Sequence, residues 1–440
     1  MARSLTGAPP KINRAAGGRK QTRMITLFQN VPVFATLALA MFVGFAPSID
    51  AKGLLDGLPS PMNPQVEQIR VMEARTWLEL GAPADDPEWG SARGRSWSAK
   101  MPAAEDLGGA FLFGEGVHGW WDKDSGRYMD DLWFYDLNAH RWICLHPGTK
   151  VPGDGLAMTD DGFEAGPDGH PTPVASMAHG YGQLTYDPER QRFLAMPCPG
   201  DYWKDALSAR AVAPDRPNES HASPWIYDVA AGHWTRIRTA QQRPPSSFGD
   251  TLVYLPSRDK IWFRHNAPGQ RQVALYDPGT NDWQPVDVSG PPPPFGIDAN
   301  DCYDTKRDRI YLGGGQYPIA PGNALWVYDV ATATWSDPQP SGSPGAAGTS
   351  YGTNEALMHY DVASDLVVLI RHRGPDESKG VHGYDPAANT WTTVDTELPD
   401  FGGRQAVSGF YHTALNVHVI FAAGDSRDDG VVWLYRHENP

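Results

Sequence analysis

Histidine follows arginine at two places in this sequence, and a third histidine precedes a pair of tryptophans. These residues are Arg264-His265, Arg371-His372 and His118. An imidazole can take up or release a proton near neutral pH, whereas a guanidinium binds a carboxylate or sulfate through two parallel hydrogen bonds. Such a set would suit an acidic saccharide, because a lyase needs a cation to neutralise the carboxylate and a base to remove the adjacent proton. The three histidines are therefore the candidate catalytic residues.

Aromatic and polar side chains accompany these residues and would bind the ligand. Aromatic faces stack on sugar rings, while amides, carboxylates and guanidinium groups form hydrogen bonds with polar substituents. The candidate binding residues are Trp120, Trp121, His179, Tyr181, Asp201, Tyr202, Trp203, Arg264, Asp298, Asn300 and Arg371. Each of these residues could instead have a purely structural role. An arginine at a strand end can form a solvated rim, tryptophans can pack a loop, and polar residues on an innermost strand can hold water.

A repeated motif indicates the elements that must position these residues. Tyr-Asp, five variable residues and Trp recur at 135–142, 227–234, 276–283, 328–335 and 384–391. A further tyrosine, at 186, 254, 303, 360 and 411, precedes a polar turn and an apolar run, which is the pattern of a β-hairpin. Each repeat then contains four strands, with the first tyrosine on the innermost strand and the tryptophan on the outermost. Four-stranded units about fifty residues apart are typical of propeller blades.

With these repeats the sequence resembles the kelch family of β-propellers over about residues 76–440, and more closely the kelch-like propeller of galactose-oxidase-type secreted proteins. The glycine doublet that the family carries at the end of the second strand is kept at Gly313-Gly314, whereas other blades differ there, so the chain is a divergent relative. The resemblance places the ends of the second strands around one mouth of the channel. It does not carry over copper chemistry, because the additional domains and the copper ligands are missing.

Closure of the ring can also be predicted. A sixth repeat begins near Arg404, but the chain reaches Pro440 before a fourth strand can follow. An unpaired edge would be prone to aggregation, so we expect the segment around Trp77 to pair with the strand around Trp433. The first strand of blade 1 would open at Trp97. The predicted fold is all-β: a six-bladed kelch-like propeller with four antiparallel strands per blade, closed by an N-terminal strand.

Composition and motifs restrict the partners. A net charge of −15 disfavours nucleic acid and anionic membrane surfaces. The sequence contains no spacing typical of a metal, nucleotide or dinucleotide site, so we expect neither a metal nor a cofactor. Three well-separated cysteines, Cys144, Cys198 and Cys302, do not form a disulfide framework and are expected to be small buried residues.

The N-terminal residues 1–51 have the outline of a signal peptide: a basic leader precedes the apolar run 33–46, which is short for a spanning helix. The protein is thus expected to be secreted or periplasmic, beginning near Lys52, with a retained N-terminal membrane anchor as the alternative. Residues 52–75 would form a short segment before the propeller of residues 76–440.

Two functional hypotheses follow. The first is an exported propeller that binds a carbohydrate or another small polar ligand at the channel mouth, as a polysaccharide lyase or sugar isomerase if it is an enzyme. The alternative is a non-catalytic interaction module that binds a protein partner.

Overall fold

The computed structural model describes most of the chain after residue 52. The described residues are 53–95, 97–114, 121–122 (backbone only), 125–150, 157–173, 180, 182–196, 219–246, 249–265, 273–294, 298–315, 325–345, 351–353, 355–401, 406–424 and 430–439. They all belong to one compact unit, Ile49–Pro440. The predicted signal peptide lies outside them. None of the helices in these ranges is long and apolar enough to cross a membrane.

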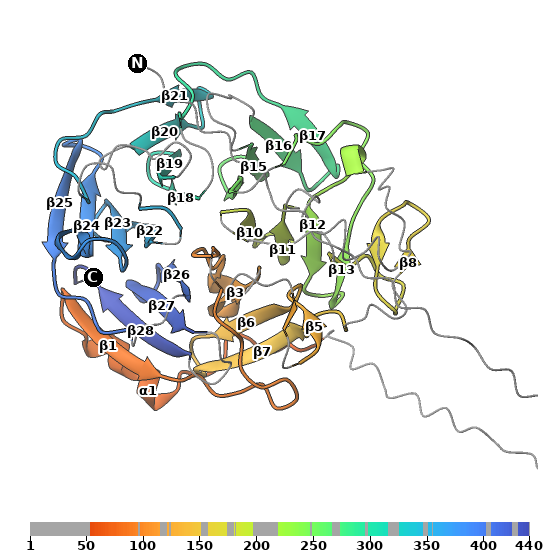
Figure 1. Cartoon of the computed structure of the whole chain (residues 1–440), viewed down its shortest axis with the longest axis horizontal. Helices are drawn as coiled ribbons and strands as arrows, with labels where there is room; N and C mark the ends of the chain where they lie inside the picture. The colour runs from red at the N-terminus through yellow and green to blue at the C-terminus, as the bar shows by residue number, and fades with distance from the viewer. Residues whose placement is uncertain are drawn as a thin grey trace, which may run out of the picture. The chain divides into compact units, whose positions relative to one another are not determined.

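Six four-stranded antiparallel sheets surround a central channel, as the repeats predict (Figure 1). Strands are given from the innermost, or first, to the outermost, or fourth. Blade 1 has β2 (Ala103–Ala104), β3 (Gly109–Leu112), β6 (Leu132–Asp136) and β7 (Arg141–His146); blade 2 has β10 (Leu184–Asp187), β11 (Arg192–Ala195), β12 (Trp225–Asp228) and β13 (His233–Thr235); blade 3 has β14 (Thr251–Leu255), β15 (Lys260–Arg264), β16 (Val273–Asp277) and β17 (Asp282–Pro285).

The remaining blades follow the same order. Blade 4 has β18 (Ala299–Asp304), β19 (Arg309–Gly314), β20 (Leu325–Asp329) and β21 (Thr334–Ser336); blade 5 has β22 (Ala356–Asp361), β23 (Leu366–Arg371), β24 (Gly380–Asp385) and β25 (Thr390–Asp395); blade 6 has β26 (Ala406–His412), β27 (Val417–Ala423), β28 (Val431–Arg436) and β1 (Thr76–Gly81). Small ribbons and single turns complete the described elements: β4 (Trp121–Asp122), β5 (Arg127–Tyr128), β8 (Ala157–Met158), β9 (Glu164–Ala165), α1 (Pro64–Glu67), η1 (Gln68–Val71), η2 (Glu105–Leu107), η4 (Glu219–His221) and η5 (Asp376–Ser378).

The N-terminal strand closes the ring, which confirms the predicted pairing. β1 lies antiparallel to β28, with Trp77 opposite Tyr435 and Glu79 opposite Trp433. The ring of Trp77 packs on Tyr435 at a centroid distance of 4.6 Å, so the closing strand is held by side chains as well as by the backbone. The prediction for Trp97 was wrong: this residue has a φ of 61°, in the left-handed region, and the first strand of blade 1 is Ala103–Ala104.

Hydrogen bonds explain why Tyr-Asp recurs. In blade 3, the carboxylate of Asp277 accepts from the backbone N–H groups of Gly279 and Thr280, at 2.8 and 3.3 Å. The hydroxyl of Tyr276 donates to Asn281 Oδ1 at 3.0 Å, and Asn281 has a φ of 54°. Asparagine tolerates this left-handed conformation better than most residues. The motif therefore builds the tight turn between the third and fourth strands.

The repeated tryptophans pack blade against blade. Trp142 of blade 1 meets Phe421 of blade 6 edge-on at 4.9 Å, and Trp335 of blade 4 lies 6.0 Å from Trp262 of blade 3. Aromatic pairs of this kind add to the stabilisation from apolar burial. The predicted burial of the cysteines is confirmed for Cys144 and Cys302, whereas Cys198 lies outside the described residues.

Arginine and aspartate join the turns between first and second strands of neighbouring blades. Arg190 of blade 2 makes two hydrogen bonds to Asp259 of blade 3, at 2.7 and 2.6 Å. Arg307 of blade 4 makes the corresponding pair to Asp365 of blade 5, at 2.6 and 2.8 Å. Bidentate pairs fix geometry as well as adding energy. We call the side of the ring that carries these turns the turn face.

Candidate binding site in the central channel

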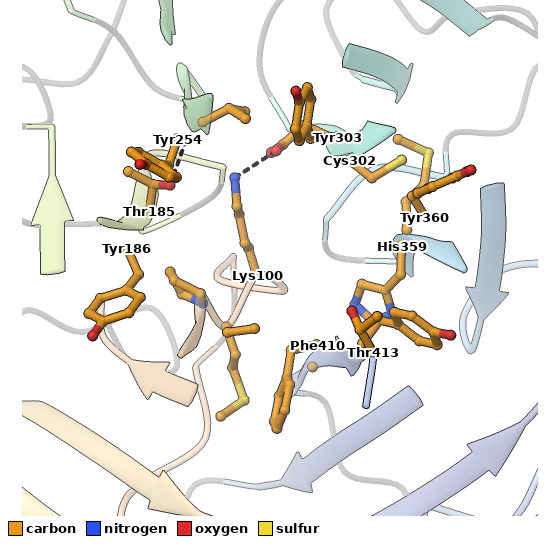
Figure 2. Close-up of a pocket in the computed structure, with 18 of the residues that line it drawn as sticks. Lys100, Thr185, Tyr186, Tyr254, Cys302, Tyr303, His359, Tyr360, Phe410 and Thr413 are labelled. Carbon is orange, nitrogen blue, oxygen red and sulfur yellow. Dashed lines mark hydrogen bonds and ion pairs between the residues drawn. The ribbon is translucent and has the colours of Figure 1, made fainter. Parts of the chain in front are cut away.

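A cavity of about 450 Å³ occupies the channel and is lined from all six blades. Its walls are formed by the first strands and by the turns that follow them, so it lies toward the turn face. Figure 2 shows Tyr186 on one side of this space and His359 on the other, with Lys100 between them. Most of the lining is apolar or aromatic, including Pro102 and Phe410. Mostly apolar pockets with a few polar groups are typical of ligand sites.

The repeat itself supplies much of this lining. The first tyrosine of each hairpin and the residue before it both border the cavity. Their side chains point to opposite faces of the blade, but the innermost strand is the edge of the blade, so side chains on both faces reach the channel. The preceding residues differ from blade to blade, whereas the tyrosines do not. The paired positions are Thr185-Tyr186, Val253-Tyr254, Cys302-Tyr303, His359-Tyr360 and Phe410-Tyr411. The variable position therefore gives the cavity its individual chemistry.

Lys100 contributes an ammonium group to the cavity wall. Its Nζ donates to Asp301 Oδ2 at 2.6 Å and to the carbonyl of Leu252 at 2.8 Å. Burial raises the pKa of Asp301, an effect that the charge of Lys100 opposes. An ammonium has three N–H donors, and its contacts with described residues use two of them. The charge of Lys100 is thus balanced by Asp301.

A chain of three titratable side chains ends at the opposite wall. Asp361 Oδ2 lies 3.2 Å from Nε2 of the buried His418, whose Nδ1 lies 3.2 Å from Nδ1 of His359. Burial, together with the neighbouring His418, lowers the pKa of His359 to about 3. Burial alone would raise the pKa of Asp361, but its hydrogen bonds, first that from His418, bring the pKa below its usual range. The imidazole of His359, which lines the cavity, is therefore neutral at neutral pH.

An exposed apolar side chain stands at the mouth of the cavity. Only two large hydrophobic residues of the described ranges are exposed, Val71 at 80% and Val362 at 41%. Val362 lines the cavity on the turn face, whereas Val71 belongs to η1 and does not. The apolar surface of the channel thus continues to the outside at Val362.

The two predicted binding arginines lie at the other end of the first strands. Arg264 pairs with Thr251 and Arg371 with Ala356, the residues at which β14 and β22 begin. Neither forms a solvated rim, because both side chains are buried. The guanidinium of Arg264 lies 5.7 Å from the ring centroid of Trp335 in blade 4, and burial lowers its pKa to about 10.

The side chain of Arg371 donates hydrogen bonds to two backbone carbonyls. Its Nη1 donates to Pro344, in the segment that enters blade 5, at 3.1 Å, and its Nε donates to Arg373 at 3.2 Å. Arg371 thus connects the end of β23 to the loop from the preceding blade.

The histidines beside these arginines, His265 and His372, are both half-buried. Nδ1 of His265 lies 3.3 Å from Asp250 Oδ1. Burial, and to a smaller extent Arg373, lowers the pKa of His372 to about 3. His372 is therefore neutral at physiological pH.

The predicted channel residues Asp298 and Asn300 connect blade 4 to the start of blade 5. Asp298 accepts a hydrogen bond from the hydroxyl of Thr353, and Asn300 donates to the carbonyl of Tyr351 at 2.6 Å. Among the predicted residues whose side chains are described, Asn300 alone lines the cavity. The side chains of His118, Trp120, Trp121, His179, Tyr181, Asp201, Tyr202 and Trp203 lie outside the described part of the chain, although the backbone of Trp121 forms part of β4.

Sequence reasoning missed the residues that give the cavity its polar chemistry. Lys100, His359 and His418 were not among the candidates. One signal was present: His359 directly precedes a repeat tyrosine, where three other blades have Val253, Cys302 and Phe410. A histidine at a repeat position that holds threonine, valine, cysteine or phenylalanine in other blades can be found by aligning the blades.

The fold and its central cavity define the class of the protein, a six-bladed β-propeller. No protein-family profile matches the chain. It is 23% identical over 283 residues to acyl-CoA-binding domain-containing protein 4 of Arabidopsis thaliana, which covers 62% of this chain and 38% of that protein. It is 35% identical over 83 residues to the Rab9 effector protein with kelch motifs of Xenopus laevis, covering 18% of this chain and 22% of that protein.

A further similarity is to human Kelch domain-containing protein 2, at 26% identity over 124 residues, covering 27% of this chain and 30% of that protein. The chain thus spans well under half the length of each of these relatives. Together with the six four-stranded blades, the similarities identify a divergent kelch-like propeller.

Proposed function

We propose that this protein is an interaction module that binds a segment of a partner protein on its turn face and takes one side chain of that segment into the channel cavity. The observation that carries the proposal is the cavity itself: an apolar and aromatic pocket at the centre of a face whose surrounding turns are polar. Protein interfaces have this anatomy, with a desolvated aromatic centre inside a polar rim.

The turns around the cavity support the proposal because they are held in place before any partner arrives. The pairs Arg190–Asp259 and Arg307–Asp365 connect neighbouring blades at this face. A preorganised surface loses little conformational entropy on binding. One relative is by name a Rab9 effector protein, which also favours a protein partner here.

The carbohydrate hypothesis has less support. It needs Arg264 and Arg371 as ligand-binding cations, and both are buried between blades. Lyase or isomerase activity, export and a secreted or periplasmic location stay predictions from the sequence.

The two exposed valines provide a matched test of the proposal. Immobilised wild-type protein should retain a partner from an extract of its own cells, and Val362→Asp should abolish retention because it places a charge at the cavity mouth. Val71→Asp, an equivalent change outside the cavity, should retain the partner as wild type does. Circular dichroism melting must show that both variants fold. Equal retention by Val362→Asp and wild type, or no retention by wild type, would contradict the proposal.

A further inference from the structure

The mouth of the cavity is formed by the turns that follow the first strands. In blades 2 to 6 the residue two places after the repeat tyrosine lines the cavity, and none of these residues is charged: Pro188, Pro256, Thr305, Val362 and Thr413. Blade 1 has no tyrosine there, but its first strand ends at Ala104, which pairs with Gly109 as the last residue of β10 pairs with the first residue of β11 in blade 2. The equivalent residue in blade 1 is therefore Glu105, and Asp106 beside it lines the cavity as well.

These two carboxylates have no cation beside them. Glu105 Oε1 accepts from the backbone N–H of Thr413 at 2.6 Å. Asp106 Oδ2 accepts from the hydroxyl of Tyr186 at 2.9 Å and from the side-chain amide of Gln191 at 3.3 Å. Both acidic residues are exposed, and within the described part of the chain neither forms an ion pair. Their hydrogen bonds hold them at the mouth and leave their negative charge uncompensated.

The turn that carries the two carboxylates is held by the core. Leu107, the third residue of η2, is buried between blades 1 and 2 together with Leu55 of the N-terminal segment. Gly108 then ends the turn with a φ of 73°, in the left-handed region that glycine adopts freely. The position of the carboxylates is therefore set before any partner binds.

The inner wall of the cavity, in contrast, has its titratable groups paired within the protein. The ammonium of Lys100 is balanced by Asp301 at 2.6 Å (Figure 2). The ring of His359 is hydrogen-bonded to the carbonyl of Gly409 and lies 3.2 Å from His418. Apolar side chains form most of the remaining inner wall, among them Met101, Pro102, Val253, Leu357 and Phe410.

This arrangement sets two requirements for a ligand at two depths. An apolar side chain suits the inner wall, because it needs no hydrogen bond there. A positive charge suits the mouth at blade 1, since a cation placed deeper would approach the ammonium of Lys100. An acidic segment would be repelled by Glu105 and Asp106, and the net charge of −15 attracts basic segments from a distance.

Resting on the proposed function, we infer that the partner segment is basic: it places an apolar side chain in the cavity and a lysine or arginine beside Glu105 and Asp106. Burial of the apolar side chain supplies most of the affinity, whereas the carboxylates select the charge of the segment. Because the carboxylates belong to blade 1 alone, the basic residue lies on the blade 1 side of the apolar one.

A random peptide library displayed on phage tests this inference with the full-length protein. Immobilised protein should select peptides in which a lysine or arginine lies next to, or one position away from, a large apolar residue. A synthetic peptide of the recovered sequence should bind in fluorescence anisotropy titrations. It should lose binding when its apolar residue becomes serine, and also when its basic residue becomes glutamate. A recovered pool without enrichment of lysine and arginine, or unchanged affinity after either replacement, would overturn the inference.

A double variant assigns the selection of charge to the mouth. Glu105→Gln with Asp106→Asn removes both charges, while the amide oxygens can still accept the bonds from Thr413 and Tyr186. At low ionic strength this variant should bind the peptide about fivefold more weakly than wild type, as exposed ion pairs provide. Its affinity should also depend less on salt, because salt screens the attraction in wild type. Equal affinities of this variant and wild type would contradict the inference.

The control removes the same two charges elsewhere. Asp376 and Glu377 are exposed residues of η5, which follows the second strand of blade 5 and does not line the cavity. Asp376→Asn with Glu377→Gln should keep the wild-type affinity and salt dependence, and circular dichroism melting must show that both double variants fold. If Val362→Asp abolishes partner retention but the selected peptides are not basic, the interaction module stands and only the basic segment fails. Recovery of no peptide by wild type would contradict both proposals.

Discussion

Nδ1 of His359 on the first strand of blade 5 lies 3.2 Å from Nδ1 of His418 on the second strand of blade 6, in nearly the same plane. The contact joins two blades through titratable groups and ends at the central cavity. The packing of blade 5 against blade 6 should therefore depend on pH, whereas purely apolar packing would not.

Acid should therefore weaken the fold. Burial lowers the pKa values of His359 and His372 to about 3, far below those in an unfolded chain. Because the unfolded state then binds more protons as pH falls from about 6.5 toward 3, the free energy of unfolding should decrease by up to about 1.4 kcal/mol per pH unit for each histidine. Urea unfolding across this range should show a shallower slope for His359→Gln than for wild type. The exposed control, His170→Gln, should keep the wild-type slope, and a wild-type slope in His359→Gln would contradict the assignment.

Loss of the closing strand should abolish cooperative folding. Deletion of residues 52–82 removes β1 and with it the partner of β28, so the sixth blade would have an unpaired edge. It also removes Val66 and Ile69, which are buried in the core between blades 6 and 1. Thermal melting followed by circular dichroism should show a broad, low transition. A sharp transition at the wild-type temperature would disprove this account of closure.

Arg371 should contribute to stability, in contrast to the rim role suggested by the sequence. Arg371→Ala removes a buried cation that bonds to Pro344 and Arg373, so the free energy of unfolding should fall by about 1.5–3 kcal/mol. Arg70→Ala, at an exposed arginine of η1, should change it by less than about 0.5 kcal/mol. Chemical denaturation measures both, and equal stabilities would contradict the structural role.

The left-handed turn residue of the repeat offers a paired substitution. Asn281→Gly and Asn281→Ala both lose the bond from Tyr276, which is expected to cost about 1 kcal/mol. Alanine must also adopt the φ of 54°, at a further cost of about 1 kcal/mol, whereas glycine adopts it freely. Asn281→Ala should therefore be the less stable variant in urea titrations. The reverse order would show that this turn is not strained for alanine.

The blades could be predicted because their markers are local. Tyr276 and Trp283 define one hairpin whatever the rest of the chain does, and the same pattern appears in every complete repeat. Closure by Trp77 was predictable because one strand was lacking and a similar tryptophan was available.

The site was harder to predict because it depends on distant parts of the chain. Sequence reasoning placed the candidate mouth at the ends of the second strands, whereas the described cavity lies toward the turn face. A strand-end arginine such as Arg371 gives no sign of whether it faces solvent or a neighbouring blade. His359 and His418 belong to different blades and become a pair only when the ring has formed.

The pairing of β1 with β28 also has a consequence for how the protein is made. The blades that lie between these strands can form in order as the chain leaves the ribosome, since each hairpin pairs nearby residues. β1 is synthesised before all the other strands of the ring, whereas its partner β28 is synthesised after all of them. Closing the ring is therefore the step of greatest sequence separation and is expected to be the slowest. Until the ring closes, β1 is an unpaired strand and is prone to aggregation. A chaperone that binds the nascent chain at β1 would protect it during this interval.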